Sequence, residues 1–205
     1  RWGFPIVTAG TVYPYLESVG IGPWESIRGP IPLNDYLKEN LSEEQKRELR
    51  FAPKTGVEIY EKPNGQGSYT ASGIQSGGGT MLFCILPGNL VPITAEWKHG
   101  FKKVSLIPPG GFIGKEESPA DAAKREFEEE TGIFLENTIY LGGVGSDGRR
   151  LEHINHHFLG FPKNPVEKIS ARLDENEFIK IVLFPLLEWH ALITAGQVYD
   201  GPAAV

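Results

Sequence analysis

The chain has almost no cysteine and no long apolar run. Cys84 is the single cysteine among 205 residues, which excludes an intramolecular disulfide framework. It lies in the apolar run TMLFCIL, where we expect a reduced core residue. No segment is apolar over the roughly 20 residues needed to span a bilayer, and no charged-then-apolar leader is evident. We therefore expect a cytoplasmic location.

The chain also lacks an excess of basic residues. It holds 20 Lys and Arg against 26 Asp and Glu, a formal net charge of -6. Binding a nucleic acid backbone as the main task requires a basic face, so this class of function is disfavoured. A small phosphorylated ligand remains compatible, because a bound metal ion can reverse the local charge.

The N-terminal part of the chain differs in composition and apolar spacing from the part that follows it. Residues 1–32 are rich in Gly and Pro and predict an extended arm with turns. Residues 33–51 carry apolar side chains near helical spacing. We predict an N-terminal arm with one helix over residues 1–55 and one main domain over residues 56–205.

The main domain alternates short strand-like runs with two helical segments. One acidic helix is predicted between residues 118 and 132, and a final helix ends at Gly196, a favourable left-handed stop. This order predicts an α+β fold, an α/β/α sandwich with a mixed sheet between helices. The predicted strands cover residues 57–62, 69–74, 80–86, 90–97, 102–107, 139–145, 153–161 and 178–184.

The acidic helix gathers carboxylates near its C-terminal end. At about 100° per residue, Glu126, Glu129 and Glu130 converge on one side, whereas Glu128 faces elsewhere and is predicted to be solvated. Like charges at this spacing destabilise a helix whose C-terminus is already partly negative. Arg125, four positions before Glu129, can hold one of the carboxylates.

A bound cation would offset the repulsion between these carboxylates. Hard oxygen ligands with few protein contacts suit Mg²⁺, with Mn²⁺ as a second possibility. The turn Pro109-Gly110-Gly111 could add a backbone carbonyl oxygen from Gly110. The alternative is a surface helix whose acidic side chains only face water.

The spacing around this helix resembles a family motif. Gly111 is followed after five residues by Glu117, and after seven more by Arg125-Glu126-Phe127-x-Glu129-Glu130-x-Gly132-Ile133. This pattern is similar to the Nudix box, whose family hydrolyses a nucleoside diphosphate linked to another moiety with the help of divalent metal. The resemblance implies the metal ligands Glu126, Glu129, Glu130 and the Gly110 carbonyl. It also implies that Arg125 and Glu117 orient the ligands, and that Arg125 and Glu129 take part in catalysis.

A second stretch, residues 173–205, resembles the C-terminal part of ADP-ribose pyrophosphatases. In that group one glutamate of a loop before the last strand is the general base and a nearby one assists the metal. The matching residues are Glu175 and Glu177, with a solvated acidic loop as the alternative. The turn Ser146-Asp147-Gly148 and the Pro-Pro-Gly-Gly sequence over residues 108–111 depart from the usual pattern of that group.

Four further residues are candidate substrate contacts. Arg149 and Arg150 follow the Ser146-Asp147-Gly148 turn and could bind phosphate or ribose. By resemblance Lys98 is a basic substrate contact, and Trp97 could stack on a base. Solvation of the arginines and packing of Trp97 are the alternatives.

The N-terminal part has a role implied only by the resemblance. ADP-ribose pyrophosphatases use N-terminal elements to form a homodimer that completes the nucleotide pocket. Tyr13, Tyr15, Trp24 and Tyr36 could supply such contacts, or could only pack.

The histidines predict no zinc site. On a strand His153 and His157 share one face and His156 takes the other, so the three would not converge.

Taken together, these features predict an Mg²⁺-dependent hydrolase that cleaves ADP-ribose to AMP and ribose 5-phosphate. UDP-glucose, ADP-glucose or a dinucleotide is an alternative substrate, and a nucleotide-sensing domain without activity is an alternative class. A purely structural interaction domain would not need Gly111, Glu117 and Arg125 at their spacing.

Overall fold

The computed structural model describes residues 3–21, 55–61, 68–74, 78–98, 102–145, 153–163 and 179–198, and only the backbone of the first two strands. The helix predicted within residues 33–51 lies outside these ranges. Each predicted strand region of the main domain is confirmed. The strands are β1 (Thr55–Glu61), β2 (Ser68–Ile74), β3 (Gly79–Cys84), β4 (Leu90–Lys98), β5 (Lys103–Ile107), β6 (Leu135–Gly145), β7 (Ile154–Pro162) and β8 (Ile179–Pro185).

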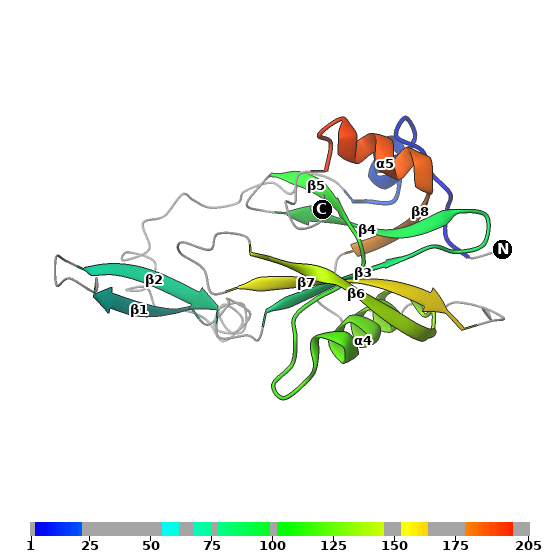
Figure 1. The fold of residues 1–205 in the computed structure, drawn as a ribbon. Coiled ribbons are helices and arrows are strands. Elements are labelled where there is room, and N and C mark those ends of the chain that lie inside the picture. The colour runs from blue at the N-terminus through cyan, green and yellow to red at the C-terminus, as the bar shows by residue number, and fades with distance from the viewer. Residues whose placement is uncertain are drawn as a thin grey trace, which may run out of the picture.

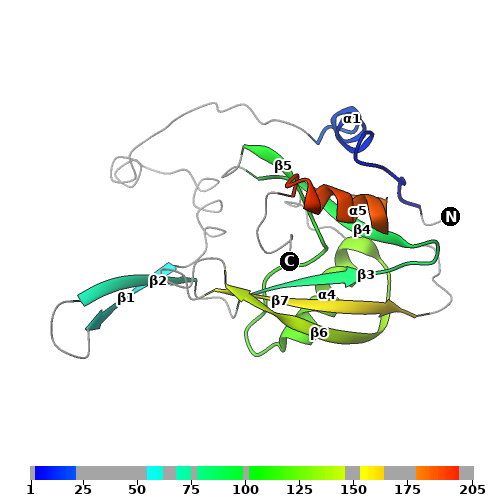
Figure 2. The ribbon, with the colours of Figure 1, turned by 45° about the horizontal axis from the view of Figure 1, so that its top comes forward.

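The strands form three sheets. β1 and β2 pair as a separate antiparallel ribbon that extends beyond the other elements (Figures 1 and 2). A mixed sheet has the order β3-β7-β6, with β3 parallel to β7 and β6 antiparallel to it. The antiparallel sheet has the order β5-β4-β8, so β4 is paired along both edges.

Two helices cover the sheets from opposite sides (Figure 1). Helix α4 (Pro119–Thr131) packs on β3, β6 and β7, whereas α5 (Leu186–Thr194) packs on β4 and β8. The predicted α/β/α arrangement is therefore confirmed. Among the described residues, no helix is both long and apolar enough to cross a membrane.

Local sequence signals set the ends of α4. Ser118 Oγ accepts a hydrogen bond from Asp121 N at 3.1 Å, and this caps the first turn. Gly132 ends the helix with a φ of 69°, and its N–H donates to Glu128 O at 2.7 Å. Ala123 and Phe127 are fully buried and pack with Leu82 and Phe158 of the mixed sheet, as the helical spacing predicts.

The beginning of the chain packs on the antiparallel sheet. Val7 N donates to Leu183 O and Leu183 N donates to Pro5 O, both at 2.8 Å, so this segment lies along the edge of β8. The sequence predicts an extended arm here, but the structure contains the helix α1 (Val12–Ser18), beside α5 in Figure 2. Pro14 is tolerated because it lies in the first turn, where its missing N–H has no helical partner. A domain boundary at residue 55 stays a prediction.

The segment that precedes α4, residues 109–118, is called the box loop. It runs along the free edge of β3, with Thr80 N donating to Gly111 O at 2.8 Å and Leu82 N to Pro109 O at 2.9 Å. These bonds fix the loop against the mixed sheet and bring it next to the carboxylates of α4.

Removing the buried side chain of α1 tests whether residues 3–21 are part of the main core. Leu16 is 1% exposed and packs with the cluster around Trp189. We expect Leu16→Ala to lower the free energy of unfolding by about 2–5 kcal/mol, measured by urea denaturation. Leu187→Ala is the matched control, because Leu187 is 82% exposed, and it should change stability by less than about 0.5 kcal/mol. Equal effects of the two substitutions would contradict this packing.

Candidate functional site

Glu130 of α4 is buried between the two sheets. Only 7% of the surface of this residue is exposed to solvent. Oε2 accepts a hydrogen bond from Thr94 Oγ1 at 3.1 Å and one from Gly110 N at 3.3 Å. Thr94 belongs to β4 and Gly110 to the box loop, so donors from both sheet layers hold this carboxylate. The sequence motif does not include Thr94, and no signal in the sequence identifies it.

Arg125 joins the remaining carboxylates to the box loop. Its Nε donates to Glu117 Oε1 at 2.9 Å and its Nη2 to Glu117 Oε2 at 3.0 Å, a bidentate pair. Nη1 donates to Glu126 Oε1 at 2.8 Å and to Glu129 Oε2 at 3.1 Å. Nη2 also donates to Phe112 O at 3.2 Å. One guanidinium therefore fixes three carboxylates and the backbone of the loop.

These contacts shift the ionisation of both partners. The hydrogen bond from Arg125 lowers the pKa of Glu117, and the bond from Gly114 N lowers it further. The hydrogen bond to Glu117 raises the pKa of Arg125 above its already high ordinary value. Glu117 therefore stays a carboxylate and Arg125 a cation across the neutral pH range.

Close contacts with neighbouring atoms require glycine at two of the three glycine positions of the box loop, Gly110 and Gly111. A Cβ on Gly111 would lie 2.5 Å from Cδ of Glu126 and 2.6 Å from each of its carboxylate oxygens. A Cβ on Gly110 would lie 2.0 Å from Thr80 O, a backbone atom that cannot move independently. Gly111 thus makes room for a carboxylate, and Gly110 allows the loop to approach β3.

The donor set of this region suits a hard divalent cation. Glu126, Glu129 and Glu130 lie on one flank of α4, and the Gly110 carbonyl has no hydrogen-bond donor among the described residues. In the same ranges, no group of three or more His, Cys, Asp or Glu side chains is close enough together to hold a metal ion by itself. Mg²⁺ does not need one, because it retains waters and takes further ligands from substrate phosphates. The residues therefore fit such an ion.

Glu128 has a different position from the other glutamates, as predicted. It is not only solvated, however, because its Oε1 accepts a hydrogen bond from Leu135 N at 3.3 Å. Glu128 thus joins the end of α4 to the start of β6.

The structure separates the two substrate contacts predicted on β4. Lys98 pairs with Glu96 and shares the face of β4 that carries Thr94, the face toward Glu130. Trp97 points to the opposite face. There it lines a cleft of about 560 Å³ together with Tyr13, Lys102 and Lys103. The structure therefore brings Lys98, but not Trp97, to the side of the sheet with the carboxylates.

The other predicted site residues are Arg149, Arg150, Glu175 and Glu177. All four lie outside the described residues, and their roles stay predictions.

An apolar cavity of about 280 Å³ lies between the mixed sheet and α5. Its wall includes Met81 and Phe83 of β3, and Trp189 and His190 of α5. Pro108, next to the box loop, also lines it. Met81, which lines the cavity, lies against Gly110: a Cβ on Gly110 would be only 2.9 Å from Met81 Cα. The cavity therefore adjoins the box loop, whose Gly110 N donates to Glu130. Sequence reasoning missed this cavity because its residues come from four separate elements.

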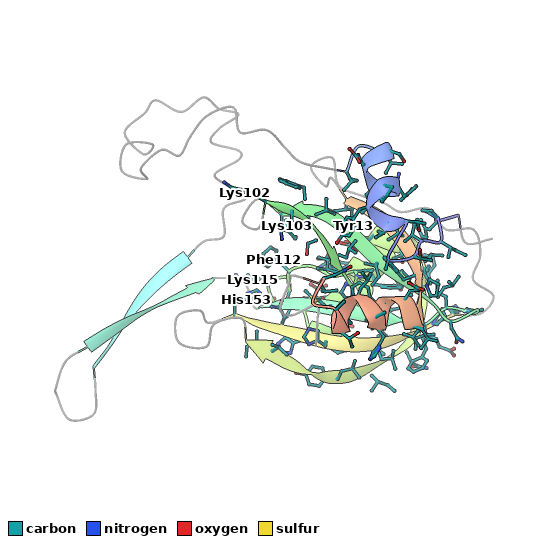
Figure 3. The ribbon with its side chains drawn as sticks, turned by 90° about the horizontal axis from the view of Figure 1, so that it is seen from above. Tyr13, Lys102, Lys103, Phe112, Lys115 and His153 are labelled. Carbon is teal, nitrogen blue, oxygen red and sulfur yellow. The ribbon has the colours of Figure 1, made fainter. Side chains whose placement is uncertain are left out.

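The three neighbouring histidines have separate surroundings. His156 Nδ1 lies 3.1 Å from the hydroxyl of Tyr140, and His157 lines the apolar cavity. The His153 ring meets Phe112 edge to face, with 6.2 Å between the ring centroids. Figure 3 shows Phe112, Lys115 and His153 at the same end of the domain as Lys102 and Lys103.

Comparisons with known proteins agree with this arrangement. The NUDIX domain family matches residues 88–200. The chain is 27% identical over 152 residues to the methanol dehydrogenase activator of Bacillus methanolicus, and the aligned region covers 74% of this chain and 81% of that protein. It is 25% identical over 148 residues to the ADP-ribose pyrophosphatase of Bacillus subtilis (strain 168), and the aligned region covers 72% of this chain and 79% of that protein.

A solved structure supports the fold. A crystal structure of an ADP compounds hydrolase superposes with a TM-score of 0.51 at 16% identity. The match covers 72% of this chain and 85% of that chain. The arrangement of sheets and helices is therefore the Nudix fold.

Adding one methyl group at Gly110 or at Gly111 tests the different close contacts of these two glycines. We expect Gly111→Ala to displace the Glu126 carboxylate, a flexible end group, and to lower activity with little change in melting temperature. Gly110→Ala should lower both, because its methyl group meets the backbone of β3. Differential scanning fluorimetry and hydrolysis assays check both variants. Full activity of Gly111→Ala would contradict the proposed close approach.

Replacing Glu117 by Gln tests the charge pair with Arg125. At pH 7 we expect a stability loss below about 1 kcal/mol, because the pair lies near solvent. The lowered pKa of Glu117 means that the wild-type advantage is present above its ordinary pKa of about 4.3. This advantage is lost as the pH falls through the still lower folded value. Melting temperatures of the two proteins should therefore converge below about pH 4. A difference that persists unchanged at a pH well below the folded pKa of Glu117 would show that the pair does not stabilise the fold through charge.

Proposed function

This chain belongs to the Nudix family of pyrophosphohydrolases, and we propose that it hydrolyses the diphosphate of a nucleoside diphosphate-sugar, with ADP-ribose as substrate. Water adds across the P–O–P bond, and the products are AMP and ribose 5-phosphate. The observation that carries the proposal is the cluster of Glu126, Glu129 and Glu130 on one flank of α4, organised by Arg125 and the box loop.

Nudix enzymes typically use divalent metals, and we propose Mg²⁺ here, with Mn²⁺ able to replace it. Glu126, Glu129, Glu130 and the Gly110 carbonyl would hold the ion. When bound, the ion neutralises diphosphate charge and activates water. Arg125 and Glu117 keep the carboxylates in place. Glu175 or Glu177 would accept the proton of the attacking water.

Both sides of the box loop have features that suit a nucleotide-sugar. On the α5 side of the mixed sheet, opposite to α4, an apolar cavity of about 280 Å³ with Phe83 and Trp189 in its wall has room for a flat base. Lys98 is on the carboxylate side of β4, where an ammonium group can approach the diphosphate. Arg149 and Arg150 are proposed as further phosphate or ribose contacts. Trp97 can contact the base only if the substrate extends to the face of β4 that points away from the carboxylates.

ADP-ribose is favoured over other nucleoside diphosphates by similarity. The Bacillus subtilis relative at 25% identity is an ADP-ribose pyrophosphatase. The glutamates at positions 175 and 177 resemble the catalytic loop of that group. UDP-glucose, ADP-glucose or a dinucleotide is the alternative, because the Ser146-Asp147-Gly148 turn departs from the pattern of that group. A sensor without activity would not need all three carboxylates of α4.

We also propose that the enzyme is a homodimer in which N-terminal residues contribute to the substrate site. Tyr13 is exposed and lies beside Lys102 and Lys103 in the open cleft (Figure 3). Tyr15 packs against the core of the antiparallel sheet, which fits a structural role better than a contact with a partner. Trp24 and Tyr36 lie outside the described residues.

A substrate panel with two glutamate variants tests the proposed reaction. We expect Mg²⁺-dependent release of AMP from ADP-ribose at a kcat/KM at least about tenfold above ADP-glucose, UDP-glucose and NADH. Glu130→Gln should lower kcat at least about a hundredfold, because the buried carboxylate is lost while the side-chain shape remains. Glu128→Gln is the matched control on the same helix, and its amide oxygen can still accept from Leu135 N.

The outcomes separate the alternatives. Preference for another compound, with loss of activity in Glu130→Gln, would keep the reaction and change the substrate. Binding of ADP-ribose without cleavage by the wild type would favour the sensor and contradict the proposed function. Equal activity of the two glutamine variants would remove Glu130 from the site.

A further inference from the structure

We propose that Thr94 is a positioning residue whose hydroxyl fixes the orientation of Glu130 for binding a divalent cation. The inference rests on the proposed function, because it assumes that Glu130 is a metal ligand. It goes beyond the sequence motif, since Thr94 precedes Glu130 by 36 positions and belongs to a different element.

The contact between the two side chains is direct and buried. Thr94 Oγ1 donates to Glu130 Oε2 at 3.1 Å, and the residues are 1% and 7% exposed. A hydroxyl can donate to an ionised carboxylate, whereas the carboxylate can only accept. A hydrogen bond to a charged group in a buried setting contributes more than one between neutral groups at the surface.

The donor itself is rigid. Thr94 lies in the middle of β4 and is paired with Ile107 of β5 on one side and with Ile181 of β8 on the other. Its β-branched side chain has few rotamers on such a strand. The position of the hydroxyl is therefore set by the whole antiparallel sheet and does not adjust to the glutamate.

The second donor to the same oxygen comes from the other layer. Gly110 N reaches Glu130 Oε2 at 3.3 Å from the box loop, which is hydrogen-bonded to β3 of the mixed sheet. Glu130 thus lies between two fixed donors, one from each sheet. A glutamate has several rotatable bonds, so removing either donor would widen the range of its carboxylate orientations.

A merely structural threonine would behave differently. Replacing a buried hydroxyl by a methyl group of similar size changes packing little, so a structural role predicts an effect on stability alone. A positioning role predicts weaker cation binding that a serine at the same position restores. Residues that orient metal ligands typically affect metal affinity or activity by about 10–100-fold when replaced.

The test measures binding of Mn²⁺ alone, by electron paramagnetic resonance and isothermal titration calorimetry, together with melting temperature and the kcat and KM for the best substrate. The proteins are the wild type, Thr94→Val, Thr94→Ser and Ser105→Ala. Ser105 is the matched control, because its buried hydroxyl lies on the same face of the neighbouring strand and has no hydrogen-bond partner among the described residues.

We expect Thr94→Val to weaken Mn²⁺ binding about tenfold or more and to lower kcat more than it raises KM. Thr94→Ser should recover most of both, and Ser105→Ala should match the wild type. Wild-type Mn²⁺ affinity in Thr94→Val, or an equal loss in Ser105→Ala, would overturn this inference and leave the proposed function standing. A wild type that binds no Mn²⁺ would overturn both.

Discussion

The arrangement of the site depends on the guanidinium of Arg125. The carboxylates of α4 lie close together near the C-terminal half of a helix, where they repel one another and face the negative end of the helix dipole. Arg125 offsets part of this repulsion by contacting Glu126 and Glu129 at once, and it joins them to Glu117 and to the backbone of Phe112. Because its planar fork has donors on several sides, one side chain can fix both the helix and the loop.

Glu130 is held by neutral hydrogen-bond donors, whereas Glu117, Glu126 and Glu129 are held by the charged guanidinium of Arg125. The contacts to its Oε2 come from a hydroxyl and a backbone N–H, and they arise where the box loop of one sheet meets the central strand of the other. The site is therefore built at the junction of two sheets, and it requires the packing of α4 on one side and of α1 and α5 on the other. A change in the spacing of the sheets would alter the donors to Glu130 before it altered the contacts of Arg125.

Much of the fold follows from local patterns. Strand-like runs separated by Gly and Pro turns identify β1 to β8, and Ser118 and Gly132 mark the ends of α4 because capping acts within one turn. Local patterns do not predict the short helix α1. It has no side-chain cap and contains a proline, and its stability comes from burying Val12 and Leu16 in the core of the antiparallel sheet. The hydrogen bond from Leu135 N to the Glu128 carboxylate cannot be predicted from local patterns either, because it depends on how the chain turns after Gly132.

The sequence by itself determined which carboxylates share one flank of α4 and that Arg125 reaches Glu129, because helix geometry relates residues a few positions apart. Trp97 and Lys98 are neighbours on a strand and lie on opposite faces because side chains alternate, although both are predicted as substrate contacts. Only the tertiary structure decided which of those faces meets the carboxylates, that Thr94 donates to Glu130, and that residues of β3 and α5 enclose an apolar cavity. These relations depend on strand register and on the packing of elements far apart in the chain, which no local pattern encodes.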